Sequence, residues 1–398
     1  MHPMRRWRFD VFVLWIAIVC GILSLSSCEE APARADGVWV DTLRGGRVVV
    51  SSPDSPSSRV APTFTLIEEL RIGSVEGDCD AFGDVISVTV DDPGRIYVAD
   101  LGANIIRVFS PQGECLQSVG REGSGPGEFA MLAGIVRSRH SLWAMDARAR
   151  RLTLFDSTGA VRASLSLGPS MSARFPWPLW VDSHGHVHRW AVPFAVPDGT
   201  IPPLRPRFLV RHSNGATLAA PDTFLVPRLE RPVETYSRTT GNLRETSPVP
   251  HSPAIALTVD GAGDVWVANR AIFDLHRVTY QGDTTKTIRL RRPPAPLVGH
   301  DRQQIAAATG VPPDNLPDHK LSLRSIHSGA NGWLWVATET GAVREWDVFD
   351  ESGVYIGRIA SPVPLDTRPP PVFGEETVIG VSRDALDLQY VVRLRIIR

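Results

Sequence analysis

This chain has few lysines, few cysteines and almost no net charge, and these shortages limit the functions that it can have. Only Lys286 and Lys320 are lysines, so nearly all of the cationic side chains are arginines. The formal net charge is −1 over 398 residues, and the arginine clusters at 148–151 and 289–292 are short. Such clusters are typical of a solvated face. Because no basic stripe runs along the chain, we predict that nucleic acid is not a partner.

Recognisable catalytic motifs are also missing. The sequence has neither a nucleophile-elbow motif nor a zinc-protease motif. The glycine-rich run at 123–127 is not followed by a helix whose N-terminus could bind phosphate, so we interpret it as a linker. The sequence therefore leans against an enzyme.

The N-terminus lacks a run long enough to span a membrane but has the features of an export signal. Arg5, Arg6 and Arg8 precede an apolar run at 11–25, about 15 residues where a spanning helix needs roughly 20. Residues 25–28, Leu-Ser-Ser-Cys, resemble a bacterial lipobox. That resemblance implies a signal peptide at 1–27 and lipid on Cys28, which would become the mature N-terminus. An uncleaved anchor helix is the alternative.

The lipobox resemblance also implies a location. Glu29, rather than aspartate, follows Cys28, as in lipoproteins of the outer membrane of Gram-negative bacteria. We therefore expect a lipid-anchored protein of the bacterial cell envelope, on the outer membrane. Residues 28–60 are rich in Ala, Ser, Pro and Asp and are predicted to be a flexible tether.

Two cysteines remain after the N-terminal segment, Cys79 and Cys115. An oxidising compartment would permit a disulfide between them. In the repeat described next they fall at opposite ends of one unit, so we predict that they are not bridged.

A four-strand pattern recurs along the chain. Residues 84–120 contain four short runs of β-branched and aromatic residues, separated by turns with Gly, Pro and Asp. The second run of this unit, 95–100, has five counterparts, at 142–146, 187–190, 265–268, 334–337 and 378–381. Tyr97 and Trp143 are 46 residues apart, and Trp335 and Ile379 are 44 apart. A period near 45 with four strands predicts a propeller blade, and six copies predict an all-β, six-bladed β-propeller over 61–398.

The two ends of the repeat predict how the ring closes. The last copy has no fourth strand before the chain ends, and a strand at 64–72 precedes the first copy. We predict that this N-terminal strand completes the last blade, because the pairing removes two open sheet edges.

The first blade resembles an NHL repeat. The resemblance lies in residues 98–109, Val-Ala-Asp-Leu-Gly-Ala-Asn-Ile-Ile-Arg-Val-Phe, and in the linker 120–129. Asn104 matches the family's asparagine, whereas Ile105 stands where His or Arg is usual. The second half of the chain resembles bacterial six-bladed propeller lipoproteins of unassigned activity. NHL-like propellers include binding modules, lyases and lactonases, so the resemblance implies the fold and leaves function open.

Three long insertions, at 191–206, 225–250 and 293–320, interrupt the regular connections. In an up-and-down blade they all fall on the same face, and a short helix is predicted at 301–309. Loops on a rigid scaffold commonly carry binding sites, although these loops could merely cap the ring. The candidate ligand-binding residues in or near them are Trp177, Trp180, Trp190, Arg205, His251 and Arg270.

The histidines at 184, 186 and 188 form the one histidine cluster. His186 and His188 alternate onto the same side of a strand and could share a metal, but the sequence identifies no third ligand. A turn and a polar sheet face are the preferred interpretation, and we predict no cofactor.

We predict a membrane-tethered binding module for a small molecule, sugar, peptide or envelope protein. The alternative is a propeller enzyme, a metal-dependent hydrolase, lactonase or lyase with its site at the ring mouth. Convergent His, Asp and Glu side chains at that mouth would favour the enzyme, and arginines with aromatic side chains would favour binding.

Overall fold

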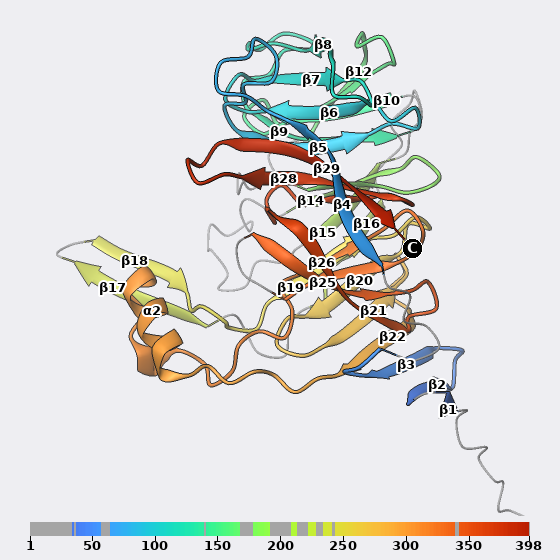
Figure 1. Ribbon diagram of the computed structural model, residues 1–398, viewed down its shortest axis with the longest axis vertical. Helices are drawn as coiled ribbons and strands as arrows, with labels where there is room; N and C mark the ends of the chain where they lie inside the picture. The colour runs from blue at the N-terminus through green and yellow to red at the C-terminus, as the bar shows by residue number, and fades with distance from the viewer. Residues whose placement is uncertain are drawn as a thin grey trace, which may run out of the picture.

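Short runs of β-branched and aromatic residues form the strands of this protein, and turns containing glycine separate them. The computed structural model describes residues 34–35, 37–56, 64–138, 141–167, 178–191, 208–212, 222–227, 234–240, 243–338 and 342–397. Strands dominate these residues (Figure 1). No helix in this part of the chain combines the length and apolarity needed to cross a membrane.

Six four-stranded antiparallel units repeat along the chain, and we number them blades 1 to 6. Blade 1 consists of β5 (Val85–Val90), β6 (Ile96–Asp100), β7 (Ile105–Phe109) and β8 (Cys115–Val119). Blade 2 consists of β9 (Leu132–Ser138), β10 (Ser141–Asp146), β11 (Arg151–Phe155) and β12 (Val161–Ser166). Blade 3 consists of β13 (Leu179–Val181), β14 (Val187–Ala191), β15 (Phe208–His212) and β16 (Asp222–Leu225).

The remaining blades follow the same order. Blade 4 consists of β19 (Ile255–Val259), β20 (Val265–Asn269), β21 (Asp274–Val278) and β22 (Thr284–Arg291). Blade 5 consists of β23 (Ser325–Ser328), β24 (Leu334–Ala337), β25 (Val343–Phe349) and β26 (Tyr355–Leu365). Blade 6 consists of β27 (Val372–Phe373), β28 (Thr377–Arg383), β29 (Gln389–Ile397) and β4 (Thr65–Ile72).

The ring closes through β4, as the sequence predicts. This N-terminal strand pairs antiparallel with β29, from Ile72 opposite Val391 to Thr65 opposite Ile397. Leu66 and Ile72 are only 3% and 4% exposed, so the strand also contributes to the core. The prediction of a six-bladed propeller closed by its first strand is confirmed.

Six hydrophobic clusters lie between neighbouring blades, one for each of the six pairs. The cluster between blades 5 and 6 contains Trp335, Trp346 and Phe373. The cluster between blades 6 and 1 joins Ile379 and Val391 to strands of blade 1. The other four clusters join blades 1 and 2, 2 and 3, 3 and 4, and 4 and 5. Because every pair shares a core, the blades form one continuous ring.

The connections of the blades define two faces. Turns from the first to the second strand and from the third to the fourth lie on one face, which we call the turn face. Connections from the second to the third strand, and from one blade to the next, lie on the other, the insertion face. This follows from the antiparallel order within each blade.

Two insertions on the insertion face fold together into a small unit. The first contains the hairpin of β17 (Thr235–Thr240) and β18 (Leu243–Pro248), and the second contains α2 (Gly299–Thr309) and η1 (Pro313–Asn315). Val249, Leu297, Val311 and Leu316 form its core. Figure 1 shows β17, β18 and α2 projecting from the ring on the same side. The predicted helix is present and ends at Gly310, whose φ is 71°.

Part of the predicted tether is instead folded. β2 (Val38–Thr42) pairs with β3 (Val48–Pro53), β1 (Arg34–Ala35) pairs with β2, and β3 runs parallel to β22. Blade 4 thereby becomes a seven-stranded sheet. The prediction of an irregular tether over 28–60 is wrong for these strands. Val48, Val49 and Val50 suit a strand, and the exposed edge of β22 provides the partner.

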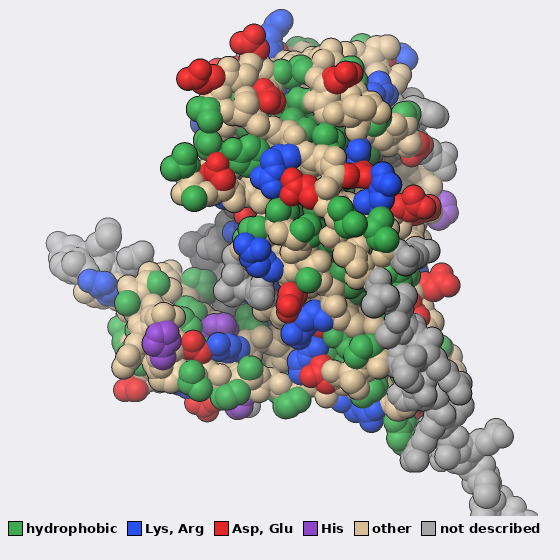
Figure 2. All heavy atoms as spheres, in the orientation of Figure 1, with side chains coloured by type: hydrophobic (Ala, Val, Ile, Leu, Met, Phe, Trp, Pro, Cys, Tyr) green, Lys and Arg blue, Asp and Glu red, His purple; other side chains and the backbone are tan. Residues whose placement is uncertain are grey.

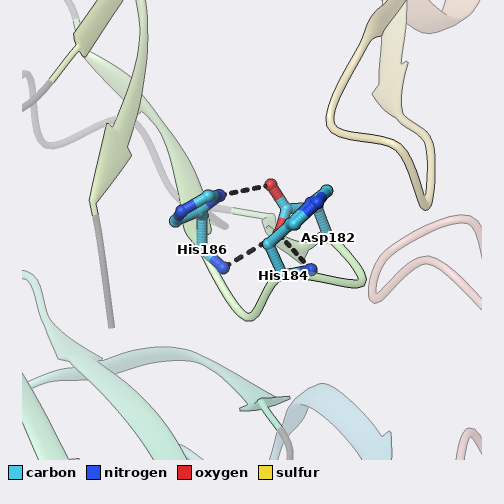
Figure 3. A group of neighbouring side chains, drawn as sticks. All are labelled: Asp182, His184 and His186. Atoms are coloured by element: carbon cyan, nitrogen blue, oxygen red, sulfur yellow. Dashed lines mark hydrogen bonds and ion pairs between the residues drawn. The ribbon is translucent and has the colours of Figure 1, made fainter. Parts of the chain in front are cut away.

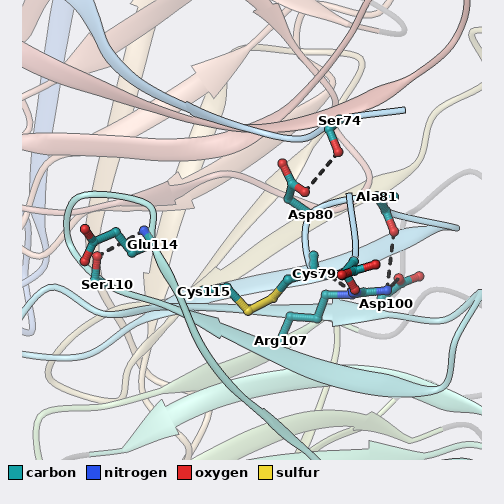
Figure 4. Close-up of a disulfide and its surroundings, with 10 residues drawn as sticks. Ser74, Cys79, Asp80, Ala81, Asp100, Arg107, Ser110, Glu114 and Cys115 are labelled. Carbon is teal, nitrogen blue, oxygen red and sulfur yellow. Dashed lines mark hydrogen bonds and ion pairs between the residues drawn. A yellow bond between two sulfur atoms is a disulfide. The ribbon is translucent and has the colours of Figure 1, made fainter. Parts of the chain in front are cut away.

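The prediction about the two cysteines is also wrong, because Cys79 and Cys115 form a disulfide (Figure 4). The segment 74–82 does not stay at one end of blade 1. The Arg107 guanidinium binds the carbonyl oxygens of Cys79 and Ala81 at 2.7 and 3.3 Å. The Phe82 ring packs against Phe109 at 6.0 Å. The segment therefore crosses the blade and brings Cys79 to the first residue of β8.

Candidate functional site

Three arginines lie in connections on the insertion face. Arg270 follows β20, Arg324 directly precedes β23, and Arg368 lies between β26 and β27. They belong to blades 4, 5 and 6. The backbone carbonyl of Arg270 accepts hydrogen bonds from the amides of Ser322 (2.9 Å) and Leu323 (3.3 Å). These contacts hold the connections of Arg270 and Arg324 against each other. We call Arg270, Arg324 and Arg368 the arginine cluster.

Arg270 is the most constrained member of the arginine cluster. Its Nε donates to the carbonyl oxygen of Leu323 at 3.5 Å, and its buried Nη2 has no hydrogen-bond partner among the described residues. Burial, followed by the positive charges of Arg324 and Arg368, lowers its pKa to about 10. A buried guanidinium donor without an acceptor is costly, and an anion would satisfy it.

Arg324 has a similar electrostatic environment. Its pKa is lowered, first by burial and then by the charge of Arg368. No carboxylate in the described part of the chain contributes to the pKa of Arg270 or Arg324. Arg368 itself is exposed. Three positive charges therefore share a small region, and no described carboxylate is paired with any of them.

Several other buried or half-buried arginines are neutralised by carboxylates. Arg292 pairs with Asp347 and with Asp54, and Arg277 pairs with Asp260 at 2.7 Å. Figure 2 likewise shows cationic and anionic side chains interspersed over the ring in that view. The arginine cluster differs from this pattern, and guanidinium groups recognise carboxylate, phosphate and sulfate through paired hydrogen bonds.

The small unit formed by the two insertions, which we call the insertion unit, lies beside the arginine cluster. His251 and Lys320 are the residues at this border. His251 Nδ1 accepts a hydrogen bond from the Leu321 amide at 3.2 Å. Burial, then the charges of Lys320, Arg324 and Arg270, lowers the pKa of His251, which is therefore neutral at pH 7. Lys320 is paired with Asp301 of α2 at 2.7 Å. The unit thus adds a neutral imidazole beside the cluster.

The sequence-predicted ligand residues do not all come together. His251 and Arg270 meet at the arginine cluster. Trp190 packs against the cores on both sides of blade 3, and Trp180 packs against the core between blades 3 and 4. Both tryptophans are half-buried. Trp177, Arg205 and the lipidation candidate Cys28 lie outside the described residues.

Arg324 and Arg368 are functional candidates that the sequence reasoning missed. Both could have been found from the blade topology, because each lies in a connection between two blades. Such connections always lie on the insertion face. Considering every arginine in such a connection, rather than only those near long insertions, would have found them.

His184 and His186 lie in the turn between β13 and β14, on the turn face (Figure 3), and His188 is the second residue of β14. The Asp182 carboxylate is 2.8 Å from His186 Nδ1 and 3.2 Å from His188 Nε2. The structure therefore supplies a neighbour that the sequence did not identify. This cluster is separate from the arginine cluster, since it belongs to the opposite face of the ring.

Fold and sites together define a six-bladed β-propeller, and the comparisons with known proteins agree with this class. The family DUF5128, described as a 6-bladed beta-propeller, matches residues 78–165. No match to a curated protein was found.

Several solved structures are similar to this chain. A member of the DUF4221 family from Bacteroides vulgatus has 8% identity and a TM-score of 0.50, covering 84% of this chain and 99% of that one. A protein from Bacteroides fragilis described as exported has 10% identity and a TM-score of 0.49, covering 88% and 100%. Virginiamycin B lyase from Staphylococcus aureus has 12% identity and a TM-score of 0.43, covering 84% and 100%. At these identities the similarity concerns the fold alone.

Proposed function

We propose that this protein is a lipid-anchored, extracytoplasmic binding module that holds an anionic ligand at the arginine cluster on its insertion face. The ligand class is a small acid or an acidic sugar bearing carboxylate, phosphate or sulfate groups. The observation that carries the proposal is the group of three arginines, of which Arg270 and Arg324 have lowered pKa values and no carboxylate contribution. Such a group favours an anion that replaces the missing counter-charge.

Two features support a location outside the cytoplasm. The N-terminal residues 5–28 have the order of a lipoprotein signal, with the predicted lipid on Cys28. The disulfide between Cys79 and Cys115 suits an oxidising compartment. Because Glu29 follows Cys28, we propose that the protein is anchored in the outer membrane. The resemblance of residues 98–109 to an NHL repeat supports a relationship to NHL-like propellers.

The enzyme alternative has less support. It requires convergent His, Asp or Glu side chains at the ring mouth. Within the described residues, the one group of three such side chains with metal-ligand spacing is Asp182, His184 and His186, which belongs to the turn face. On the insertion face, which holds the arginine cluster, the described residues contain no group of this kind.

Citrate is a suitable probe, because it offers three carboxylates to a cluster of three guanidinium groups. Isothermal titration at low salt should detect citrate binding to the wild-type protein. Arg324→Gln should weaken it at least about tenfold, since a hydrogen bond to a charged group contributes roughly 1.5–3 kcal/mol. The matched control is Arg162→Gln, which removes an exposed arginine of β12 that is paired with Asp156. Equal citrate affinity in both variants would contradict the proposal.

A further inference from the structure

The turn between β13 and β14 surrounds a buried carboxylate with imidazole rings. The Asp182 side chain is only 1% exposed. Its Oδ1 accepts hydrogen bonds from the backbone amides of His184 and His186, both at 2.9 Å. Its Oδ2 contacts His186 Nδ1 and His188 Nε2. Gly185, with a φ of 86°, allows the chain to fold back tightly enough for this arrangement.

The equivalent turns of other blades show what is unusual here. In blade 1, Asp91 also accepts a backbone amide, and its Oδ2 pairs with the Arg95 guanidinium at 2.8 Å. In blade 4, Asp260 does the same with Arg277 at 2.7 Å. In blade 3 the guanidinium is replaced by histidines, which are the ion-pair partners of Asp182 within the described residues. The turn itself therefore does not require the histidines.

The imidazoles are placed for metal binding. One ligand atom each from Asp182, His184 and His186 lies within 4.8 Å of the other two. In a tetrahedral zinc site with bonds of about 2.0–2.2 Å, ligand atoms are about 3.4 Å apart, so small side-chain rotations would complete the geometry. The His184 side chain is 66% exposed, and its ring stacks beside that of His186 at 5.7 Å between centroids.

His188 orients the Asp182 carboxylate through a hydrogen bond to its Oδ2. It is fully buried, and its Nδ1 is 2.6 Å from the hydroxyl of Tyr280 in blade 4. If the Tyr280 hydroxyl donates to Nδ1, Nε2 carries the proton and donates to Asp182 Oδ2. A histidine that orients a ligating carboxylate in this way is a common outer-shell feature of metal sites.

We propose that Asp182, His184 and His186 bind a Zn²⁺ ion on the turn face of blade 3. Two imidazole nitrogens and one carboxylate oxygen are donors that zinc takes readily and that Mg²⁺ and Ca²⁺ do not prefer. The exposure of His184 leaves room for water as the fourth ligand. The ion replaces the guanidinium of blades 1 and 4 as the counter-charge of the buried aspartate.

The test is zinc titration by calorimetry on the full chain without a histidine tag. The wild-type protein should bind one Zn²⁺ at this site, with no comparable heat from Mg²⁺. His184→Ala should weaken binding at least about tenfold. The matched control is His300→Ala, an exposed histidine of α2, which should leave the zinc affinity unchanged.

Two outcomes would overturn the zinc site: no zinc binding by the wild-type protein, or unchanged affinity in His184→Ala. His184 is the right residue to change because it is exposed, whereas replacing Asp182 would also remove the hydrogen bonds of the turn. Circular dichroism of His184→Ala should match the wild type. Arg324→Gln should retain full zinc affinity, which separates this site from the arginine cluster.

Discussion

At the scale of single residues, the chief feature of this protein is an imbalance of charge. Many of its described arginines pair with a carboxylate, but the pKa values of Arg270 and Arg324 are lowered by burial and by neighbouring positive charge. Like charges held together destabilise a fold, and they persist where function benefits from them. The arginine cluster therefore has consequences for stability as well as for binding.

The first prediction concerns this stability cost. Arg324→Gln should raise the free energy of unfolding of the ligand-free protein by about 0.5–1 kcal/mol, because it relieves repulsion with Arg270 and Arg368. Thermal unfolding at low salt measures the effect. Arg162→Gln, which breaks an ion pair, should not stabilise the protein. A lower midpoint for Arg324→Gln would show that this side chain supports the fold.

The second prediction concerns pH. Arg270 has a pKa of about 10, lowered by burial and by its two arginine neighbours. Its charged form is present below that pH and is lost as the pH rises through it. Citrate affinity should therefore be steady near neutral pH and decline around pH 10, far below the range where an ordinary arginine loses its charge. Titration calorimetry across this range checks it, and a constant affinity through pH 11 would contradict it.

At the scale of secondary-structure elements, the repeat could be recognised because the second strand of each blade is buried on both faces. Residues 142–146 and 334–337 are strands in the structure, and α2 covers the predicted helix. β1 to β3 could not be predicted, because their stability depends on the edge of β22, far away in the sequence. The hairpin of β17 and β18 likewise depends on packing against the second insertion.

The candidate sites could be predicted only in part, because some of their residues come together only in the folded ring. Arg270 and His251 were found from their position near insertions. Arg324 and Arg368 come from separate blades, so only the closed ring brings them together. Asp182 was missed because its side chain turns inward beneath its own turn, toward His186 and His188.

The third prediction concerns the disulfide of blade 1. Cys79 and Cys115 are 36 residues apart, so the bridge restricts the unfolded chain over most of the blade. Cys79→Ser with Cys115→Ser should lower the free energy of unfolding by about 2–4 kcal/mol. Urea unfolding with and without reductant measures this. Reductant should affect the wild type and leave the double variant unchanged, and an insensitive wild type would refute the prediction.

At the scale of the whole molecule, the ring depends on one strand from the start of the domain. β4 completes blade 6 and buries Leu66 and Ile72, each contributing roughly 1.5–3 kcal/mol through its buried side chain. Without β4, the long strand β29 would become an open sheet edge.

The fourth prediction tests this closure by truncation. A chain beginning at residue 64 keeps β4 and loses, of the described strands, β1 to β3, so it should fold as a soluble propeller. A chain beginning at residue 73 lacks β4 and should aggregate or unfold at a much lower temperature. Size-exclusion chromatography and thermal unfolding compare the two. Equal behaviour of the two chains would mean that β4 is dispensable.

Native mass spectrometry of the full-length protein released from its own membrane tests the proposed function most directly. We expect a mass increment for lipid on Cys28 and a bound acidic molecule that Arg324→Gln loses and Arg162→Gln retains. A bound molecule without acidic groups, or one that both variants retain equally, would contradict the account.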